Sequence, residues 1–332
     1  MSEKGVRRAF VADSEVHTSI LESLASAEHP LRLSESPVGA AVLITQSRNL
    51  DAALLEEAGQ TLEAVVLLEP ADASIAETSV PIHRLENASL TGVAEHTVLL
   101  MLALGKRLPW VLEQTRQRAW TPETAEPRLT SQRDYAYNWV GLEGFGTLAG
   151  RTIGLVGLGT IGTATAKMLR GFSTNVLYHK PTRLARQREL ELNVRWVDLD
   201  TLLTESDYIS LHHRFAEGAE AVEGNDEQFA RREFELMKPT AFFVNTARGR
   251  LVDEDALCDA IESGQIAGAA LDVFRYEPLP ADHRFFDLPR DRMIITPHLA
   301  GVPMREAADT VVRQIAGLLD PTRKAENNAD NA

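Results

Sequence analysis

Short apolar runs alternate with amphipathic segments along most of the chain. In the first third, apolar runs at residues 7–13, 40–46 and 62–70 predict strands, and the amphipathic segments 14–28 and 51–59 predict helices. Apolar strands separated by amphipathic helices are typical of a parallel sheet that carries helices on both faces. The pattern therefore predicts an α/β fold.

A longer helical pattern follows at residues 89–120, with one stripe of mostly apolar positions at helical spacing. The stripe comprises Val93, His96, Thr97, Leu100, Met101 and Leu104. Residues 121–150 are rich in Pro, Gly, Thr and aromatic side chains and show little periodicity, so we expect a long loop or arm there.

After Gly150 the alternation of strands and helices resumes more regularly, and a polar tail expected to be disordered ends the chain. Strands are predicted within 152–159, 175–180, 208–213, 241–247, 266–274 and 292–298. Helices are predicted within 160–172, 253–265 and 304–320 and a helical turn within 199–206, while residues 232–239 lead into the strand that follows.

Length and charge narrow the class of protein. A chain of 332 residues suggests two domains, and a net charge of -14 argues against general binding to nucleic acid or anionic membranes. Cys258 is the only cysteine, so one chain forms neither a disulfide nor a cysteine metal cluster. The first residues lack the apolar core of a secretory signal, and the longest apolar run, 97–105, is too short to span a bilayer. We therefore expect a cytoplasmic protein.

Glycines at positions 157, 159 and 162 match the pattern G-x-G-x-x-G between a predicted strand and a predicted helix. Gly157 permits a tight turn, Gly159 lets a pyrophosphate approach the backbone, and Gly162 lets the helix pack closely on the strand. The free N–H groups at the start of the helix, which includes Thr160 and Ile161, suit phosphate oxygens. The alternative is a purely structural strand-to-helix turn.

Three chemically active side chains each follow a predicted strand: Arg248, Glu277 and His298. Ligands of open parallel sheets bind beyond the carboxyl ends of the strands, so one edge of the sheet would receive all three. Arg248 can grip a carboxylate and polarise the neighbouring carbonyl, while His298 can pass a proton to the carbonyl oxygen. Glu277 can orient the ring of His298 if the two side chains touch. Taken singly, such an arginine is more often a surface ion-pair partner, and such a histidine is more often structural.

At these residues the sequence resembles the D-isomer-specific 2-hydroxyacid dehydrogenases, which include phosphoglycerate dehydrogenases and glyoxylate/hydroxypyruvate reductases. The order and spacing of the motifs fit this family from about Val93 to Gly301. The stretches that carry the resemblance are "GRTIGLVGLGTIG", "SDYISLH", "LMKPTAFFVNTARGRLVDEDAL", "IAGAALDVFRYEPLP" and "IITPHLAG".

The resemblance implies two Rossmann-like doubly wound parallel-sheet domains with a cleft between them. Residues 1–91 plus 302–332 would form the substrate domain, and 92–301 the dinucleotide-binding domain. Residues 105–150 would be a helix and arm that form a homodimer. The resemblance also implies that Arg248 binds substrate, that Glu277 pairs with the acid/base His298, and that Thr246 and Asp272 lie at the cofactor. Asp272 would contact the nicotinamide carboxamide, unless it only caps a local turn.

The sequence departs from the family pattern in three places. Residues 65–76 lack the usual glycine-rich loop and carry Glu69 and Pro70, which become candidate substrate contacts. Glu69 would repel a carboxylate if it points inward, although it can equally face solvent. Arg214 stands where proline is common, so it lies near the cofactor or the local backbone differs. Tyr135, Tyr137 and Trp139 in the arm 121–146 suit packing within a dimer, and Trp139 is also a candidate for closing over a neighbour's substrate site.

Relatives that prefer NAD carry an acidic residue at the end of the strand after the glycine turn, where it accepts hydrogen bonds from the ribose hydroxyls. The corresponding residue here is Lys180, with His179, Thr182 and Arg183 beside it. Cations and a hydroxyl group suit a ribose 2′-phosphate, so we expect NADP(H) to be preferred, with NAD(H) possible. The alternative is a solvated basic loop beside a cofactor pocket that takes both.

The leading hypothesis is an oxidoreductase that interconverts a 2-keto acid and a D-2-hydroxy acid by hydride transfer. A second enzymatic option is the oxidation of an unusual anion such as phosphite; the motif "TPH" argues against the formate dehydrogenases. A third option is a dinucleotide-sensing scaffold with little turnover, as in corepressors of this fold, because a fold alone does not determine a function.

Overall fold

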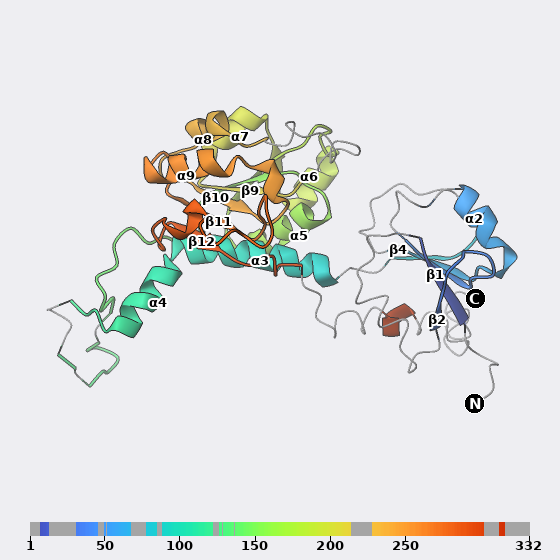
Figure 1. Cartoon of the computed structure of the whole chain (residues 1–332), viewed down its shortest axis with the longest axis horizontal. Coiled ribbons are helices and arrows are strands. Elements are labelled where there is room, and N and C mark those ends of the chain that lie inside the picture. Colours follow the sequence, from blue (N-terminus) through green and yellow to red (C-terminus); the bar gives the residue numbers. More distant parts are fainter. Residues whose placement is uncertain are drawn as a thin grey trace. The chain divides into compact units, whose positions relative to one another are not determined.

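The computed structural model in Figure 1 forms two compact units along the chain, residues 1–92 with 301–332 and residues 93–300. The residues that the structure describes are 7–12, 31–45, 50, 52–67, 78–84, 88–121, 126–127, 129–135, 137–213, 228–301 and 312–315.

The first unit contains, within its described residues, a five-stranded sheet in which every neighbouring pair of strands is parallel. The strand order is β2-β1-β3-β4-β5. Leu43 on β3 and Val65 and Leu67 on β4 are fully buried and pack with Leu50. The elements are β1 Arg7–Val11, β2 Leu31–Ser34, β3 Val42–Thr45, α2 Ala52–Ala58, η2 Gly59–Thr61, β4 Ala64–Leu67 and β5 Ile82–Arg84.

The second unit is built on a seven-stranded parallel sheet in the order β12-β11-β10-β9-β6-β7-β8. The chain runs outward from β6 to β8 and then returns to β9 on the other side of β6. The strand order therefore reverses between β6 and β9, where open α/β sheets bind their ligands. The strands are β6 Thr152–Val156, β7 Asn175–His179, β8 Val194–Trp196, β9 Tyr208–Leu211, β10 Phe242–Asn245, β11 Gly268–Leu271 and β12 Met293–Ile295.

Helices cover both faces of the larger sheet, and neighbouring residues of one strand point into different cores. Phe243 of β10 packs with the core on the side of α7, α8 and α9, whereas Val244 packs with the core on the side of α3, α5 and α6. Burying one such side chain stabilises the fold by about 1.5–3 kcal/mol. The helices of this unit are α3 Ala88–Gly105, α4 Leu108–Gln117, α5 Thr160–Leu169, α6 Arg186–Leu192, α7 Leu199–Glu205, α8 Arg231–Leu236 and α9 Glu254–Glu262.

These two parallel sheets with flanking helices confirm the predicted α/β class. The apolar pattern did not predict β2, β5, β8, α6 or α8. The helices predicted within 14–28 and 304–320 lie outside the described residues, except that residues 312–315 are helical. Among the helices described, none is long and apolar enough to cross a membrane.

The helical stretch predicted within 89–120 is two helices rather than one, as Figure 1 shows. Arg107 stands between them with a left-handed φ of 49°. Pro109, in the first turn of α4, has no N–H for the carbonyl of Gly105, and its ring would clash with that carbonyl in a continuous helix. The Gly105 carbonyl instead accepts a hydrogen bond of 2.7 Å from the N–H of Gly146, in the arm. Pro109 thus accounts for the end of α3, and the Gly105 carbonyl that it leaves free binds the arm at Gly146.

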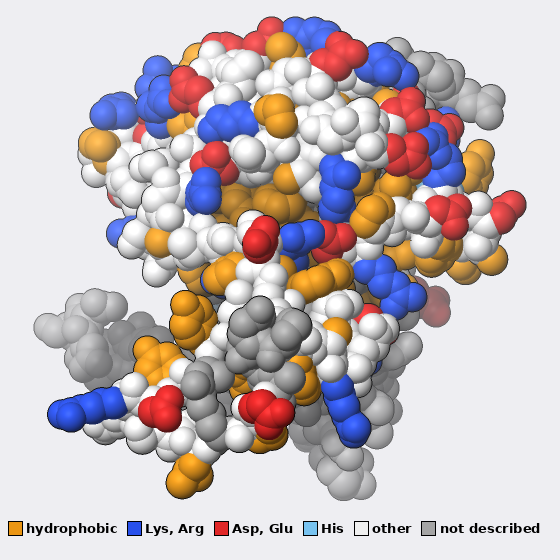
Figure 2. All heavy atoms as spheres, turned by 90° about the vertical axis from the view of Figure 1, so that its left-hand side faces the viewer, with side chains coloured by type: hydrophobic (Ala, Val, Ile, Leu, Met, Phe, Trp, Pro, Cys, Tyr) orange, Lys and Arg blue, Asp and Glu red, His pale blue; other side chains and the backbone are white. Residues whose placement is uncertain are grey.

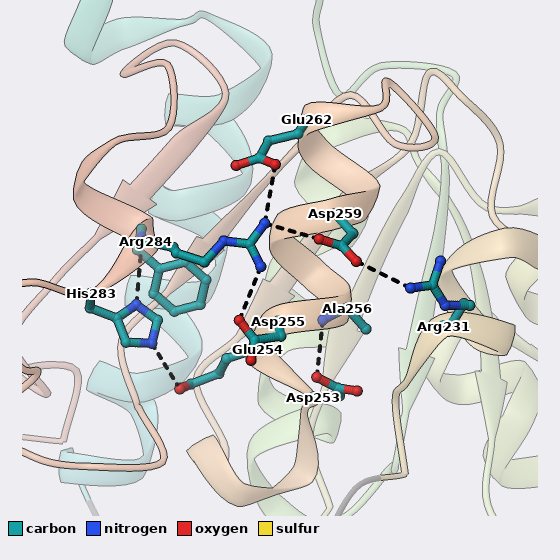
Figure 3. Close-up of polar contacts among 10 residues, drawn as sticks. Arg231, Asp253, Glu254, Asp255, Ala256, Asp259, Glu262, His283 and Arg284 are labelled. Atoms are coloured by element: carbon teal, nitrogen blue, oxygen red, sulfur yellow. Dashed lines mark hydrogen bonds and ion pairs between the residues drawn. The ribbon is translucent and has the colours of Figure 1, made fainter.

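A surface network of ion pairs joins α9 to the segment before β12 (Figure 3). Arg284, in η7 Arg284–Phe286, reaches Asp255, Asp259 and Glu262 on successive turns of α9 at 2.9–3.1 Å. Arg231 of α8 also bonds Asp259, at 3.1 Å. Each exposed pair is worth little alone, so the network mainly connects α8, α9 and η7.

Cys258, also on α9, is fully buried. Burial raises the pKa of its thiol to about 12, because the thiolate would lose its hydration there. The thiol stays protonated at ordinary pH, so Cys258 is a core side chain rather than a nucleophile.

Candidate active site

The glycine turn lies at the reversal of strand order, between β6 and α5. Gly157 follows β6 with a φ of 97°, which favours glycine. A Cβ there would come within 2.7–2.9 Å of the backbone of His212 and His213, just after β9. At Gly162 a Cβ would come within 2.6 Å of the Gly157 carbonyl oxygen. These two glycines are therefore required for close packing of β6, β9 and α5.

Gly159 differs, because a Cβ built there meets nothing within 4 Å. Gly159 is the N-cap of α5, and within the described part of the chain no side chain caps the first turn of this helix. The N–H groups of Thr160 and Ile161 thus belong to an uncapped helix N-terminus beside open space. Free N–H groups and the positive end of a helix dipole fit a phosphate or pyrophosphate group.

Of the basic side chains at and after β7, Arg183 forms an ion pair, while the side chain of Lys180 differs from it. His179 bonds the Val197 carbonyl through Nδ1 at 3.0 Å, and Thr182 is exposed. Lys180 is half-buried, and its ammonium group contacts no acidic side chain among the described residues. Arg183 donates from Nε and Nη2 to the two carboxylate oxygens of Glu189, both at 2.8 Å.

Glu189 on α6 is a buried carboxylate that the sequence analysis missed. The guanidinium of Arg183 holds the pKa of this carboxyl down, to about 2, against the opposing effect of burial, and Tyr178 and Arg186 add further hydrogen bonds. Arg183 and Glu189 are six residues apart and span a loop and a helix. No periodic pattern in the sequence could have signalled the contact.

The loops after β11 and β12 bring Glu277 and His298 into contact. His298 Nδ1 lies 2.6 Å from Glu277 Oε2, and the other oxygen of Glu277 accepts from the N–H of Phe274 at 2.9 Å. His298 has a left-handed φ of 51°, and its side chain is 49% exposed. Because Nδ1 faces the carboxylate, Nε2 is the ring nitrogen left to exchange a proton with a ligand.

Arg248 follows β10 and comes directly before η6 Gly249–Leu251. A Cβ at Gly249 would lie 1.9 Å from the carbonyl carbon of Phe274, so this glycine lets the loop after β10 contact the loop that carries Glu277. Arg248 is exposed, and Nη1 donates to the Ala247 carbonyl at 2.7 Å. The three predicted catalytic residues thus occupy neighbouring strand ends, with Glu277 and His298 in direct contact.

Asp272 holds the turn that carries His298. It is 1% exposed, and its carboxylate accepts from Thr296 Oγ1 at 2.5 Å and from the N–H groups of Leu299 and Ala300 at 3.0 and 2.9 Å. These bonds cap the turn on both sides of His298. A contact between Asp272 and a nicotinamide carboxamide stays a prediction.

Two residues of α3 support the same strand ends. His96 Nε2 lies 3.0 Å from Thr296 Oγ1, and the hydroxyl groups of Thr97 and Thr246 are 2.8 Å apart. The helical spacing of the sequence predicts only that His96 and Thr97 lie on one stripe of the helix. Their polar contacts join residues 149 to 200 positions apart in the chain, which local spacing does not reveal.

The candidate substrate residues are less well defined. Glu69, Pro70 and Arg214 lie outside the described residues. Trp139 is described: it is 50% exposed, and its ring packs edge-on against Trp120 with centroids 5.7 Å apart.

Comparison with known proteins adds three findings. The profile of the family described as "D-isomer specific 2-hydroxyacid dehydrogenase, NAD binding domain" matches residues 98–300. The glyoxylate reductase of Thermofilum pendens is 38% identical over 230 residues, which cover 68% of this chain and 61% of that protein. The D-3-phosphoglycerate dehydrogenase of Archaeoglobus fulgidus is 34% identical over 242 residues, or 70% of this chain and 40% of that protein.

Solved structures show the same fold. The D-mandelate dehydrogenase of Rhodotorula graminis superposes with a TM-score of 0.59 at 19% identity, covering 94% of this chain and 92% of that chain.

Proposed function

Because this chain belongs to the D-isomer specific 2-hydroxyacid dehydrogenase family, we propose that it reduces a 2-keto acid to the D-2-hydroxy acid, with NADPH as the preferred cofactor. The observation that carries this proposal is the 2.6 Å contact between Glu277 and His298, at strand ends in the unit that contains the glycine turn. The glyoxylate reductase and phosphoglycerate dehydrogenase among the relatives support a small keto or hydroxy acid as the substrate class.

Each catalytic side chain has a role that follows from its contacts. Glu277 accepts from Nδ1 of His298 and fixes the orientation of the ring, so Nε2 delivers the proton to the carbonyl oxygen of the substrate. Among the described residues Arg248 uses only Nη1, to hold its own loop, so the rest of the guanidinium can grip the substrate carboxylate and polarise the adjacent carbonyl. The nicotinamide cofactor, when bound, supplies the hydride to the carbonyl carbon.

We further propose that residues 93–300 bind the dinucleotide, with the uncapped N-terminus of α5 at its phosphates. The preference for NADPH is supported by Lys180, which stands at the end of β7 where a carboxylate would repel a 2′-phosphate. A carboxylate is present nearby in Glu189, but its side chain is fully buried and engaged with Tyr178, Arg183 and Arg186. It is therefore not placed to accept bonds from ribose hydroxyls.

A homodimer in the cytoplasm is the proposed form of the enzyme. Hydrophobic side chains are exposed on α4 and the arm, including Leu112, Tyr137, Trp139 and Phe145. Figure 2 shows hydrophobic side chains between charged ones on the surface of the molecule that includes α4. Apolar surface of this kind marks association sites in soluble proteins. Sedimentation equilibrium measures the mass of the assembly, and a monomer at micromolar concentration would contradict the proposed dimer.

Turnover on a panel of 2-keto acids, with NADPH and with NADH, tests the proposed reaction through the loss of nicotinamide absorbance. We expect at least one keto acid to be reduced, with a higher kcat/KM for NADPH. Tight cofactor binding without turnover on any panel member would instead favour a dinucleotide-sensing scaffold.

Replacing Lys180 by aspartate should shift the ratio of kcat/KM values for NADPH and NADH about 100-fold toward NADH. The change removes a cation that attracts the 2′-phosphate and adds an anion that repels it, while it supplies an acceptor for the ribose hydroxyls. Lys167→Asp is the matched control, because Lys167 is an exposed lysine near the far end of α5. The proposed preference is contradicted if the ratio of kcat/KM values is unchanged in Lys180→Asp. It is also contradicted if the wild-type enzyme has the same kcat/KM with NADH as with NADPH.

A further inference from the structure

Glu189 has no part in the proposed chemistry, yet it is the most heavily hydrogen-bonded carboxylate near the cofactor loop. Its side chain is fully buried on α6. It accepts from the hydroxyl of Tyr178 at 3.0 Å, from Nε and Nη2 of Arg183 at 2.8 Å, and from Nη1 of Arg186 at 3.3 Å. Such a group is costly to bury unless its partners are fixed in place, so it organises its surroundings.

The surroundings carry excess positive charge. Between Lys180 and Glu191 the chain has four basic and two acidic side chains, although the whole chain has a net charge of -14. Arg188 pairs with Glu191 at 3.0 Å. Glu189 is shared by two arginines, and Lys180 adds a further cation on the same loop. This local excess favours an anionic ligand.

The loop after β7 is held at both ends. The indole N–H of Trp196 donates to the Lys180 carbonyl at 3.1 Å, and the N–H of Leu184 donates to the hydroxyl of Tyr178 at 2.9 Å. Between these anchors the Arg183 guanidinium lies over the Trp196 ring, 5.9 Å from its centroid. The loop is thus ordered by contacts that do not involve any ligand.

Glu189 occupies only one edge of the Arg183 guanidinium. A guanidinium is planar and has five N–H groups, and the side-on edge formed by Nε and Nη2 faces the carboxylate. The end-on edge formed by Nη1 and the second hydrogen of Nη2 points away from Glu189. The Arg183 side chain is 53% exposed, so this second edge can receive another anion with the two-point geometry that phosphate prefers.

We propose that Glu189 is a positioning residue for the cofactor: it holds Arg183 so that the free edge of the guanidinium binds the 2′-phosphate of NADPH. This inference rests on the proposed cofactor preference and deepens it. Arg183 touches the ligand, and Glu189 acts through Arg183.

An effect of net charge alone and a positioning role of Glu189 predict opposite changes in the affinity of the Glu189→Gln variant for the 2′-phosphate. Removing a negative charge beside a phosphate site should tighten phosphate binding if only the net charge matters. If Glu189 positions Arg183, the variant loses the two-point hold, the guanidinium samples other rotamers, and phosphate binding weakens. The sign of the change therefore discriminates between the two explanations.

The experiment measures the Kd values of NADPH and NADH, and of adenosine 2′,5′-bisphosphate and 5′-AMP, by calorimetry on the full-length protein. We expect Glu189→Gln to raise the Kd values of NADPH and adenosine 2′,5′-bisphosphate about tenfold. The Kd values of NADH and 5′-AMP should stay within about twofold of the wild-type values. Glu191→Gln is the matched control, since it makes the same change on an exposed side chain of the same helix and should leave all four Kd values unchanged.

A double-mutant cycle separates positioning from a general structural role. Arg183→Ala should raise the Kd of NADPH by a similar factor. When Arg183 is already alanine, Glu189→Gln should raise this Kd no further. If Glu189→Gln does not fold, as judged by circular dichroism, Arg183→Lys tests the same idea. It keeps the charge but cannot hold both oxygens of Glu189 while presenting a second edge, so it should lose affinity for NADPH as Arg183→Ala does.

The outcomes are distinct. Wild-type protein that binds NADPH and NADH equally overturns the cofactor preference, and this inference with it. Wild-type protein that prefers NADPH, combined with a Glu189→Gln variant that binds NADPH as tightly or more tightly, overturns only the role of Glu189. An equal loss for NADPH and NADH, additive losses in the cycle, or full NADPH affinity in Arg183→Lys also overturns it.

Discussion

Replacing His298 by alanine should lower kcat about 1000-fold while NADPH binds as tightly as before. Proton transfer by a positioned side chain contributes about 10²–10⁴-fold to a rate, and His298 is the group at this site whose free ring nitrogen can supply the proton. Its Nδ1 is engaged by Glu277 at 2.6 Å, and Asp272 fixes the turn on both sides of it. Stopped-flow or steady-state reduction of the best keto acid gives kcat, and fluorescence titration gives the Kd of NADPH.

The control is His283→Ala, which removes a histidine that pairs with Glu254 at 3.3 Å on the side of the unit that carries α9 (Figure 3). This variant should retain kcat, although the loss of its contacts can lower the melting temperature. If His298→Ala retains kcat within about tenfold, another group delivers the proton and the proposed mechanism is wrong.

Replacing Arg248 by alanine should lower kcat/KM for the keto acid about 1000-fold, through a higher KM and a lower kcat together. The guanidinium is proposed to bind the substrate carboxylate in the ground state and to polarise the carbonyl as charge develops on its oxygen. Arg248→Lys should recover only part of the loss, because an ammonium group lacks the planar fork of donors. Substrate kinetics at saturating NADPH give both constants.

Arg231→Ala serves as the control, since Arg231 is an exposed arginine whose partner is Asp259 on α9. It should leave kcat and KM unchanged. The substrate role fails if Arg248→Ala keeps the KM of the wild type. A change in KM alone would show that Arg248 binds substrate equally in the ground and transition states.

Much of the site could be predicted from local patterns. The glycine motif lies between a predicted strand and a predicted helix, and the chemically active residues each follow a predicted strand. Both are short-range patterns. In a parallel sheet, residues that follow the strands lie at the same edge, so these patterns predict one site. The glycines illustrate the limit of such signals. Spacing alone treats Gly157, Gly159 and Gly162 alike, whereas the structure separates two that are needed for packing from one that leaves open space.

The helical stretch predicted within 89–120 is helical but divided into two helices, which the stripe does not show for a related reason. A hydrophobic stripe reports which face is buried, but it does not report where the backbone loses a hydrogen bond. Pro109 removes the donor for Gly105, and a partner from the arm, Gly146, takes its place. The proline in the sequence indicates where the helix ends, but it does not indicate which N–H replaces the lost hydrogen bond to the Gly105 carbonyl.

By itself, the sequence determined the α/β class, the family and the glycine turn, and it supplied the candidate catalytic side chains, because each of these is read from short stretches of the chain. The tertiary structure alone decided which polar groups support them: Asp272 on the turn of His298, His96 and Thr97 beneath the strand ends, and Glu189 on Arg183. These contacts join a strand end or loop to a helix or to another strand end. A buried polar group takes whichever partner the packing brings within 3 Å or so, and the packing depends on the whole chain.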